Sequence, residues 1–276
     1  MRRTLNTMAL GFCACALLAA PVLAQPAAEV TLTRLADCGT QQAPTEVNQR
    51  FSDTYSYGNL KVQFTFSCYL IKHGDQYLLW DTGHSMSATG GVAPKVSVVD
   101  QLAHLGVKPE QIQYVGISHY HADHTGQVDS FPQATLLIGK GDWDAITAPK
   151  PAAGVNAPPF ARWISGGGKV EPQPTDKDVF GDGTVVMLNT PGHTPGHHSL
   201  LVRLKEKGNV LITGDLAHFH ENYDTNGVPW FNSSRAESLA SIDRFKKLAA
   251  NFKATLIIQH DARDIGLLPA FPAAAK

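Results

Sequence analysis

The chain has 276 residues, of which 43% are hydrophobic, 17% are charged and 12 are histidines. These proportions exclude a disordered or fibrous protein and allow a substantial hydrophobic core. Lysine and arginine number 23 against 24 acidic residues, a balance that excludes the basic surface of a nucleic-acid-binding protein. Histidine is the unusually frequent residue, so its positions bear most directly on function.

Residues 1–24 have the pattern of an export signal, in which Arg2–Arg3 precede an apolar run over Met8–Leu23. The run is short for a membrane span, although an uncleaved anchor remains an alternative. We therefore expect cleavage after residue 24, a single domain over residues 25–276, and a periplasmic or secreted protein without stable membrane insertion. Two arginines do not distinguish Sec from twin-arginine export.

Two cysteines, Cys38 and Cys68, remain after the signal. An even pair in an oxidising compartment predicts a disulfide, and two buried free thiols are the alternative. Their spacing fits no cysteine-zinc pattern.

Strand-like and helical segments alternate along the rest of the chain. The expected strands are Val62–Ile71, Tyr77–Trp80, Ile112–Ile117, Ala134–Ile138, Val185–Leu188, Val210–Thr213 and Thr255–Ile258. The clearest helix covers about Arg235–Ala250, with a capping box formed by Ser234 and Glu237. This alternation predicts an α/β layered domain. The segment 148–168 is rich in proline and glycine, and we expect a long loop, either a lid or a plain surface insertion.

The segment His119–His124 carries the main functional signal. It reads His-Tyr-His-Ala-Asp-His and follows the apolar run Ile112–Ile117. Burying three imidazoles and a carboxylate without partners would be costly, and a solvated polar loop is the alternative. Imidazole and carboxylate together suit zinc and its neighbours in the first transition row.

Three further candidates, His193, Asp215 and His260, also follow expected strands. Strand ends of an α/β sheet converge along one edge, where such folds bind their ligands. The combined set of five histidines and two aspartates is large enough for two metal ions with positions left for solvent.

The His-X-His-X-Asp-His motif, followed by His193, Asp215 and His260 in this order, resembles the metallo-β-lactamase superfamily. The resemblance implies an αββα sandwich with a dinuclear site at one edge, with zinc as the expected metal. It implies the following ligands: His119, His121 and His193 for one metal, Asp123, His124 and His260 for the second, and Asp215 bridging. Asp81, in the Asp-Thr-Gly turn, would orient a ligand histidine, and a structural turn is the alternative.

The remaining histidines have weaker contexts. His73, His84 and His104 are expected at the surface or in turns. His197 and His198 are expected to support the site through hydrogen bonds rather than as ligands, and at least one of His218 and His220 to face the pocket.

The bridging Asp215 narrows the choice of enzyme class, because β-lactamases proper of the superfamily usually lack this carboxylate. The export signal argues against the glyoxalase II type, whose substrate is intracellular. The segments Gly214–His218 and Ile258–Asp261 look most like the N-acyl homoserine lactonase group. That group carries a tyrosine three residues after the bridging aspartate, where this chain has His218.

The resemblance implies an exported lactonase in which a metal-bound hydroxide attacks the carbonyl of a small-molecule lactone, such as an N-acyl homoserine lactone. Asp123 would relay a proton to the leaving alkoxide, and His218, or Tyr223 in its place, would donate to the carbonyl. The expected apolar wall for the acyl chain consists of Phe219, Tyr223, Trp230 and Phe231, or these are ordinary core aromatics.

Three rival functions remain open: a β-lactamase-like enzyme, a phosphotriesterase and a periplasmic metal carrier. A carrier would tend to close its coordination shell, whereas Asp123 and Asp215 suit a site that holds reactive solvent. The sequence leaves the oligomeric state open, a dimer included.

Overall fold

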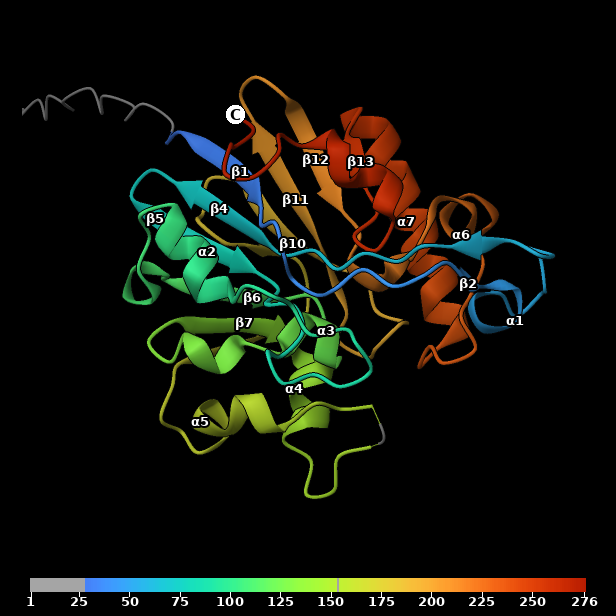
Figure 1. The fold of residues 1–276 in the computed structure, drawn as a ribbon, viewed down its shortest axis with the longest axis horizontal. Helices are drawn as coiled ribbons and strands as arrows, with labels where there is room; N and C mark the ends of the chain where they lie inside the picture. Colours follow the sequence, from blue (N-terminus) through green and yellow to red (C-terminus); the bar gives the residue numbers. More distant parts are fainter. Residues whose placement is uncertain (1–27, 153) are drawn as a thin grey trace, which may run out of the picture.

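The structure, a computed structural model, describes residues 28–152 and 154–276, in which two mixed sheets pack face to face (Figure 1). The predicted signal over residues 1–24 lies outside the described residues. Within the described ranges, no helix has the length and apolar character needed to cross a membrane.

The first sheet has six strands. In spatial order they are β1 (Val30–Arg34), β4 (Tyr69–His73), β5 (Gln76–Trp80), β6 (Tyr114–Ile117), β7 (Thr135–Gly139) and β8 (Val170–Gln173). The pairs from β5 to β8 are parallel, so the carboxyl ends of β5, β6 and β7 lie at the same edge.

The second sheet has five strands. In spatial order they are β13 (Thr255–Ile257), β12 (Gly208–Ile212), β11 (His198–Leu204), β10 (Val185–Asn189) and β9 (Lys177–Asp178). Only the β12–β13 pair is parallel among these described strands. A separate small ribbon pairs β2 (Thr45–Glu46) with β3 (Lys61–Val62).

Seven α-helices are present in the described ranges. They are α1 (Asn48–Phe51), α2 (Val98–His104), α3 (Ala122–Thr125), α4 (Lys140–Ile146), α5 (Ala161–Ile164), α6 (His220–Thr225) and α7 (Arg235–Phe252). Short 3₁₀ helices cover Pro109–Gln111, Val128–Ser130, Pro158–Phe160, Gly214–Leu216 and Ala262–Leu267.

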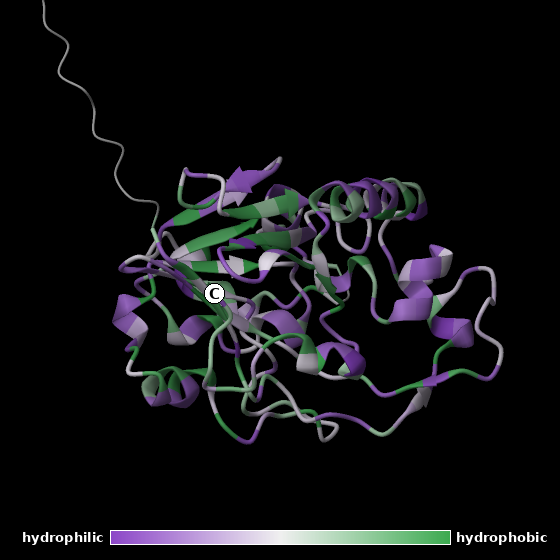
Figure 2. Ribbon diagram, turned by 90° about the horizontal axis from the view of Figure 1, so that it is seen from above, coloured by the Kyte–Doolittle hydropathy of each residue, from purple (hydrophilic) through white to green (hydrophobic). Residues whose placement is uncertain are grey.

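Buried side chains form three apolar layers between four layers of secondary structure. The middle layer joins the sheets, with Ile71 and Leu78 from one and Met187 from the other. A second layer lies between the first sheet and α2, α4 and α5, and a third places Ile242 and Phe245 of α7 against the second sheet. Most strands are hydrophobic in Figure 2, whereas the outer helices carry hydrophilic residues. The predicted αββα sandwich is therefore confirmed.

The predicted helix is confirmed as α7, where the Ser234 hydroxyl accepts a hydrogen bond from the Glu237 N–H at 3.3 Å. The predicted capping box is only half formed, because the Ser234 N–H donates to the Gly192 carbonyl at 3.0 Å and not to the Glu237 side chain. The single strand expected over Val62–Ile71 is wrong. The chain leaves the ribbon after β3 and enters the sheet only at β4, because Thr65 between them pairs with His260 instead. The Thr65 N–H donates to the His260 carbonyl at 3.0 Å.

The loop expected over residues 148–168 is also wrong in its second half, which contains a 3₁₀ turn and α5. Phe160 and Trp163 are buried against the first sheet, so hydrophobic anchoring outweighs the loop-forming composition. Cys38 and Cys68 form a disulfide, as one of the two sequence alternatives predicted.

Candidate metal centre

The ligand candidates converge from both sheets at one edge of the sandwich. His119 and His121 follow β6, and His121 is the N-cap of α3. His193 lies in the turn between β10 and β11, Asp215 in the 3₁₀ turn after β12, and His260 after β13. The sequence produces this convergence because each strand ends where its apolar run ends, and the ligand-bearing segments begin there.

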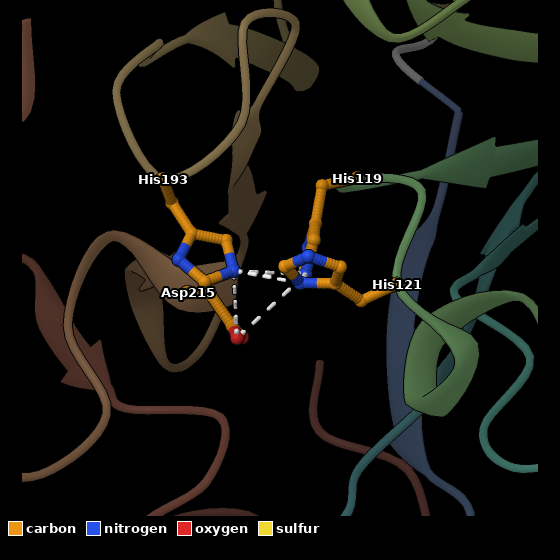
Figure 3. Close-up of side chains that lie close together, drawn as sticks. All are labelled: His119, His121, His193 and Asp215. Atoms are coloured by element: carbon orange, nitrogen blue, oxygen red, sulfur yellow. Dashed lines mark hydrogen bonds and ion pairs between the residues drawn. The ribbon is translucent and has the colours of Figure 1, made fainter. Parts of the chain in front are cut away.

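His119, His121 and His193 form the first ligand group (Figure 3). His193 Nε2 lies 3.2 Å from His119 Nε2 and 3.0 Å from His121 Nδ1, and the last two atoms are 2.9 Å apart. Three ring nitrogens at such distances leave space for one cation that all three bind, rather than for three separate hydrogen-bond partners.

Asp123, His124 and His260 form the second ligand group. His124 Nε2 and His260 Nε2 are 3.1 Å apart, and Asp123 Oδ2 lies 3.7 and 3.6 Å from them. The Asp123 side chain is 24% exposed, which makes it the most accessible acid of the site.

Asp215 lies between the two groups and presents one oxygen to each. Its Oδ2 is 3.3 Å from His193 Nε2, and its Oδ1 is 3.1 Å from His124 Nε2 and 2.9 Å from His260 Nε2. Asp215 Oδ1 is buried without a geometrically acceptable hydrogen-bond partner among the described residues. A carboxylate in this position can bridge two cations.

The ring nitrogens that face away from the site show whether the histidines are oriented to bind metals. His260 Nδ1 donates to the Thr65 carbonyl at 2.8 Å, His193 Nδ1 to Asn232 Oδ1 at 2.9 Å, and His124 Nδ1 to Asp81 Oδ2 at 2.8 Å. These bonds assign the proton to Nδ1, so the Nε2 lone pairs point inward, as metal-ligating histidines require. The residues fit two divalent cations with nitrogen and oxygen ligands, a donor set that suits zinc.

Burial favours the metal-binding protonation state of two ligands in the first group. Burial lowers the pKa of His119 and His193 well below the usual value, which keeps both imidazoles neutral. Burial alone would raise the pKa of Asp215, but the charges of His260 and His124 hold it well below its usual range. The bridging carboxylate is therefore ionised at neutral pH. Against the effect of burial, Asp215 in turn raises the pKa of His124 and His260, so metal binding at the second group would displace their protons.

Asp81 and His197 support the ligands without joining them. Asp81 accepts from His124 Nδ1, and also from the Ser118 N–H at 2.7 Å. His197 donates from Nδ1 to the Thr190 carbonyl at 3.0 Å and accepts from the Asp215 N–H at 2.9 Å. The structure thus places both residues where the sequence analysis expected supporting hydrogen bonds.

His218 reaches the site and Tyr223 does not. His218 Nε2 lies 3.0 Å from Asp215 Oδ2, and its ring packs between Phe51 and Phe231. The hypothesis that Tyr223 donates to a bound carbonyl is wrong, because its ring packs between α6 and α7 against Phe245 and beneath Lys246.

A cavity of about 730 Å³ opens over the metal centre. Its lining includes Gln42, Ala43, Thr45, Glu46, Arg50, Phe51, Phe64, Phe66, His84, Val92, His121, Asp123, His193, Asp215, His218, Phe231 and His260. No described residue of the 148–168 segment belongs to this lining, so the structure gives no support to a lid there.

The predicted aromatic wall is largely wrong. Phe231 lines the cavity, but Phe219 is buried behind Phe51, and Trp230 is 71% exposed outside the cavity. The actual wall comes from the segment 42–66, which the sequence analysis missed. Its clustered Phe51, Phe64 and Phe66 were the available signal, but Phe64 and Phe66 fell within the strand expected over Val62–Ile71.

His84 was expected at the surface or in a turn; it follows the Asp-Thr-Gly turn and also lines the cavity, with its ring 4.4 Å from that of Phe66. The Asp-Thr-Gly turn that carries Asp81 brings His84 to this position. The turn was the signal that could have identified it.

The chain resembles known proteins along most of its length. The family model described as the metallo-beta-lactamase superfamily matches residues 66–260. An N-acyl homoserine lactonase AttM from Rhizobium radiobacter is 32% identical over 179 residues, which cover 59% of this chain and 63% of the relative. An N-acyl homoserine lactonase from Bacillus cereus is 29% identical over 230 residues, covering 76% and 86%. The match therefore spans less than two thirds of the AttM relative.

Solved structures show the same fold. A quorum-quenching N-acyl homoserine lactone hydrolase superposes with a TM-score of 0.72 at 24% identity, covering 90% of this chain and 99% of the other. AidC, described as a dizinc quorum-quenching lactonase, superposes with a TM-score of 0.66 at 18% identity, covering 91% of each chain.

Proposed function

Because the chain belongs to the metallo-beta-lactamase superfamily, we propose that it is a dinuclear metal-dependent hydrolase that opens lactone rings, with N-acyl homoserine lactones as the expected substrates. The observation that carries this proposal is Asp215, whose two oxygens face two separate ligand groups at the floor of a largely apolar cavity. Relatives described as N-acyl homoserine lactonases support the substrate class.

The two ligand groups would hold the metals, with zinc expected and Asp215 between them. Divalent metals at such a site generate a nucleophile from water at neutral pH and polarise the carbonyl that is attacked.

The chain's own residues would orient the substrate and move the proton. Phe51, Phe64 and Phe231 form an apolar wall that suits an acyl chain and excludes water. Asp123 lines the cavity with an accessible carboxylate, so it is placed to pass a proton to the leaving alkoxide. His218 Nε2 lies at the cavity floor, where an N–H can donate to a carbonyl oxygen.

We also propose that the protein is exported to the periplasm or secreted. The export pattern of residues 1–24 supports this, and so does the Cys38–Cys68 disulfide, because disulfides persist in oxidising compartments. Cell fractionation with N-terminal sequencing of the mature chain tests it. A full-length protein in the cytoplasm would contradict it.

A substrate panel on protein of measured metal content tests the activity. We expect hydrolysis of acyl-homoserine lactones to exceed that of a carbapenem and of a paraoxon-type phosphotriester, and hydrolysis in ¹⁸O-water to place one heavy oxygen in the product carboxylate. A preference for the β-lactam or the phosphotriester would move the assignment to that class. Two tightly bound metals without turnover of any substrate would favour a metal carrier.

A further inference from the structure

The first ligand group depends on two loops from different sheets. His119 and His121 follow β6 of the first sheet, whereas His193 follows β10 of the second. Asp142, in the first turn of α4, lies where these loops meet and is fully buried at 0% exposure. It is not among the cavity-lining residues, and the lactonase reaction proposed above does not use it.

The Asp142 carboxylate accepts hydrogen bonds from both loops. The Tyr120 N–H donates to Oδ2 at 3.1 Å, and Tyr120 stands between His119 and His121. The Thr194 hydroxyl donates to the same oxygen at 2.8 Å, and the Gly196 N–H donates to Oδ1 at 2.7 Å. One side chain therefore connects the backbone between two ligands with the turn that carries the third.

Glycines allow this contact. A Cβ on Gly139 would overlap the Gly196 carbonyl, and a Cβ on Gly141 would crowd Pro195 at 2.7 Å. A Cβ on Gly196 would crowd the Asp142 Cβ at 2.9 Å. The start of α4 and the turn that follows His193 are thus packed backbone to backbone.

An ionised acid at this buried position lowers the stability of the fold. Burial raises the pKa of Asp142 to about 7, and its described partners are two amides and a hydroxyl, with no lysine or arginine. Burying a carboxylate without a cationic partner costs stability, so a role beyond packing is the simpler reason for it.

We propose that Asp142 is a positioning residue for the first metal, holding the loop of His119 and His121 and the loop of His193 at the separation that one cation requires. The inference rests on the proposed metal centre. It makes Asp142 the counterpart of Asp81, which holds His124 of the second ligand group directly. Hydrogen-bonded partners outside the ligand shell typically change metal affinity 10- to 100-fold, and we expect Asp142 to act within that range.

Cadmium titration of the metal-free protein, followed by ¹¹³Cd NMR, tests this. His193→Ala and His260→Ala assign one resonance to each ligand group. We expect Asp142→Asn to weaken cadmium binding at the first group about 10- to 100-fold and to leave the second group within a few-fold of wild type. Asp81→Asn is the comparison variant, and it should weaken the second group more than the first, because Asp81 contacts His124 directly and reaches the His119 loop only through Ser118.

Thr194→Val provides a second variant that removes one donor to Asp142 and keeps the side-chain shape. It should weaken cadmium binding at the first group by a smaller factor than Asp142→Asn does. It serves as the deciding variant if Asp142→Asn does not fold. Thermal unfolding of the metal-free variants separates folding from positioning. Wild-type cadmium affinity at both groups in a folded Asp142→Asn or Thr194→Val variant, or equal weakening of both groups, would overturn the inference. If the wild-type protein with cadmium showed neither resonance, the proposed metal centre itself would be contradicted.

Discussion

The floor and the wall of the cavity are built differently. The floor consists of the seven ligand candidates, which lie in segments that follow buried strands, and three of its histidines are held through their second ring nitrogen. The wall comes from the segment 42–66, whose regular structure is limited to two-residue strands and the single turn α1. We infer that the floor determines the chemistry and the wall determines which substrates enter. Changes in the floor should therefore act on metal content and kcat, and changes in the wall on KM.

The largest effect is expected at Asp215, the ligand shared by both halves of the floor. Asp215→Ala removes the only described oxygen pair that faces both ligand groups, so metal content should fall and kcat should drop by about 10³-fold or more. Metal analysis and steady-state kinetics measure this. Asp176→Ala, which removes an exposed carboxylate paired with Arg244, is the control. Full turnover with one metal per chain would contradict the dinuclear assignment.

The floor was predictable from sequence because its residues lie in short segments that follow apolar runs. Strand ends of a layered α/β fold meet at one edge, so the short spacing within His119–His124 already implied proximity. The structure brings all seven ligand candidates together, and the resemblance to the superfamily is confirmed. The contact of Asp142 with two ligand loops could not be predicted, because it depends on how closely the glycines of two sheets approach.

The second prediction concerns His218, which lies where floor and wall meet. His218→Ala should lower kcat about 10- to 100-fold with metal content unchanged, since one donor is lost while the metals still polarise the carbonyl. Tyr223→Phe is the matched control and should keep wild-type kcat, because Tyr223 packs on α7. Loss of metal in His218→Ala would make His218 a ligand.

The third prediction concerns a change that loosens the wall and leaves the ligands of the floor in place. The Cys38–Cys68 disulfide has a sequence separation of 30 and encloses Arg50, Phe51, Phe64 and Phe66 of the cavity lining. Replacing both cysteines with serine should lower the free energy of unfolding by about 3–4 kcal/mol, because the unfolded chain regains the freedom of that loop.

In the same double variant, KM should rise while metal content and kcat stay near wild type. Denaturant unfolding and kinetics with a long-chain lactone measure the two effects. Metal loss in the folded variant would show that the wall also supports the floor, for which the bond between Thr65 and His260 is the obvious route.

The wall could not be predicted in the same way. Phe64 and Phe66 alternate with polar residues like those of an ordinary strand, but the pairing of Thr65 with His260 holds this stretch at the cavity instead of in the sheet. Such a contact joins residues about 195 positions apart, and no local pattern specifies it. The exposed Trp230 and the displaced Tyr223 were misplaced for the same reason, because aromatic residues near Asp215 in sequence need not share its cavity.

The smallest expected effect is at Arg50, on the rim of the wall. Its guanidinium lies over the rings of Phe51 and Phe231, 5.6 and 5.3 Å from their centroids, and both rings line the cavity. A cation–π contact at an exposed site contributes about 0.5–1 kcal/mol, so Arg50→Gln should loosen these rings and raise KM about 2- to 5-fold. Because Arg50 contacts none of the ligands, kcat and metal content should not change. Arg162→Gln, at an exposed site outside the cavity, is the control. A fall in kcat with unchanged KM would place Arg50 in the chemistry and would contradict the division between floor and wall.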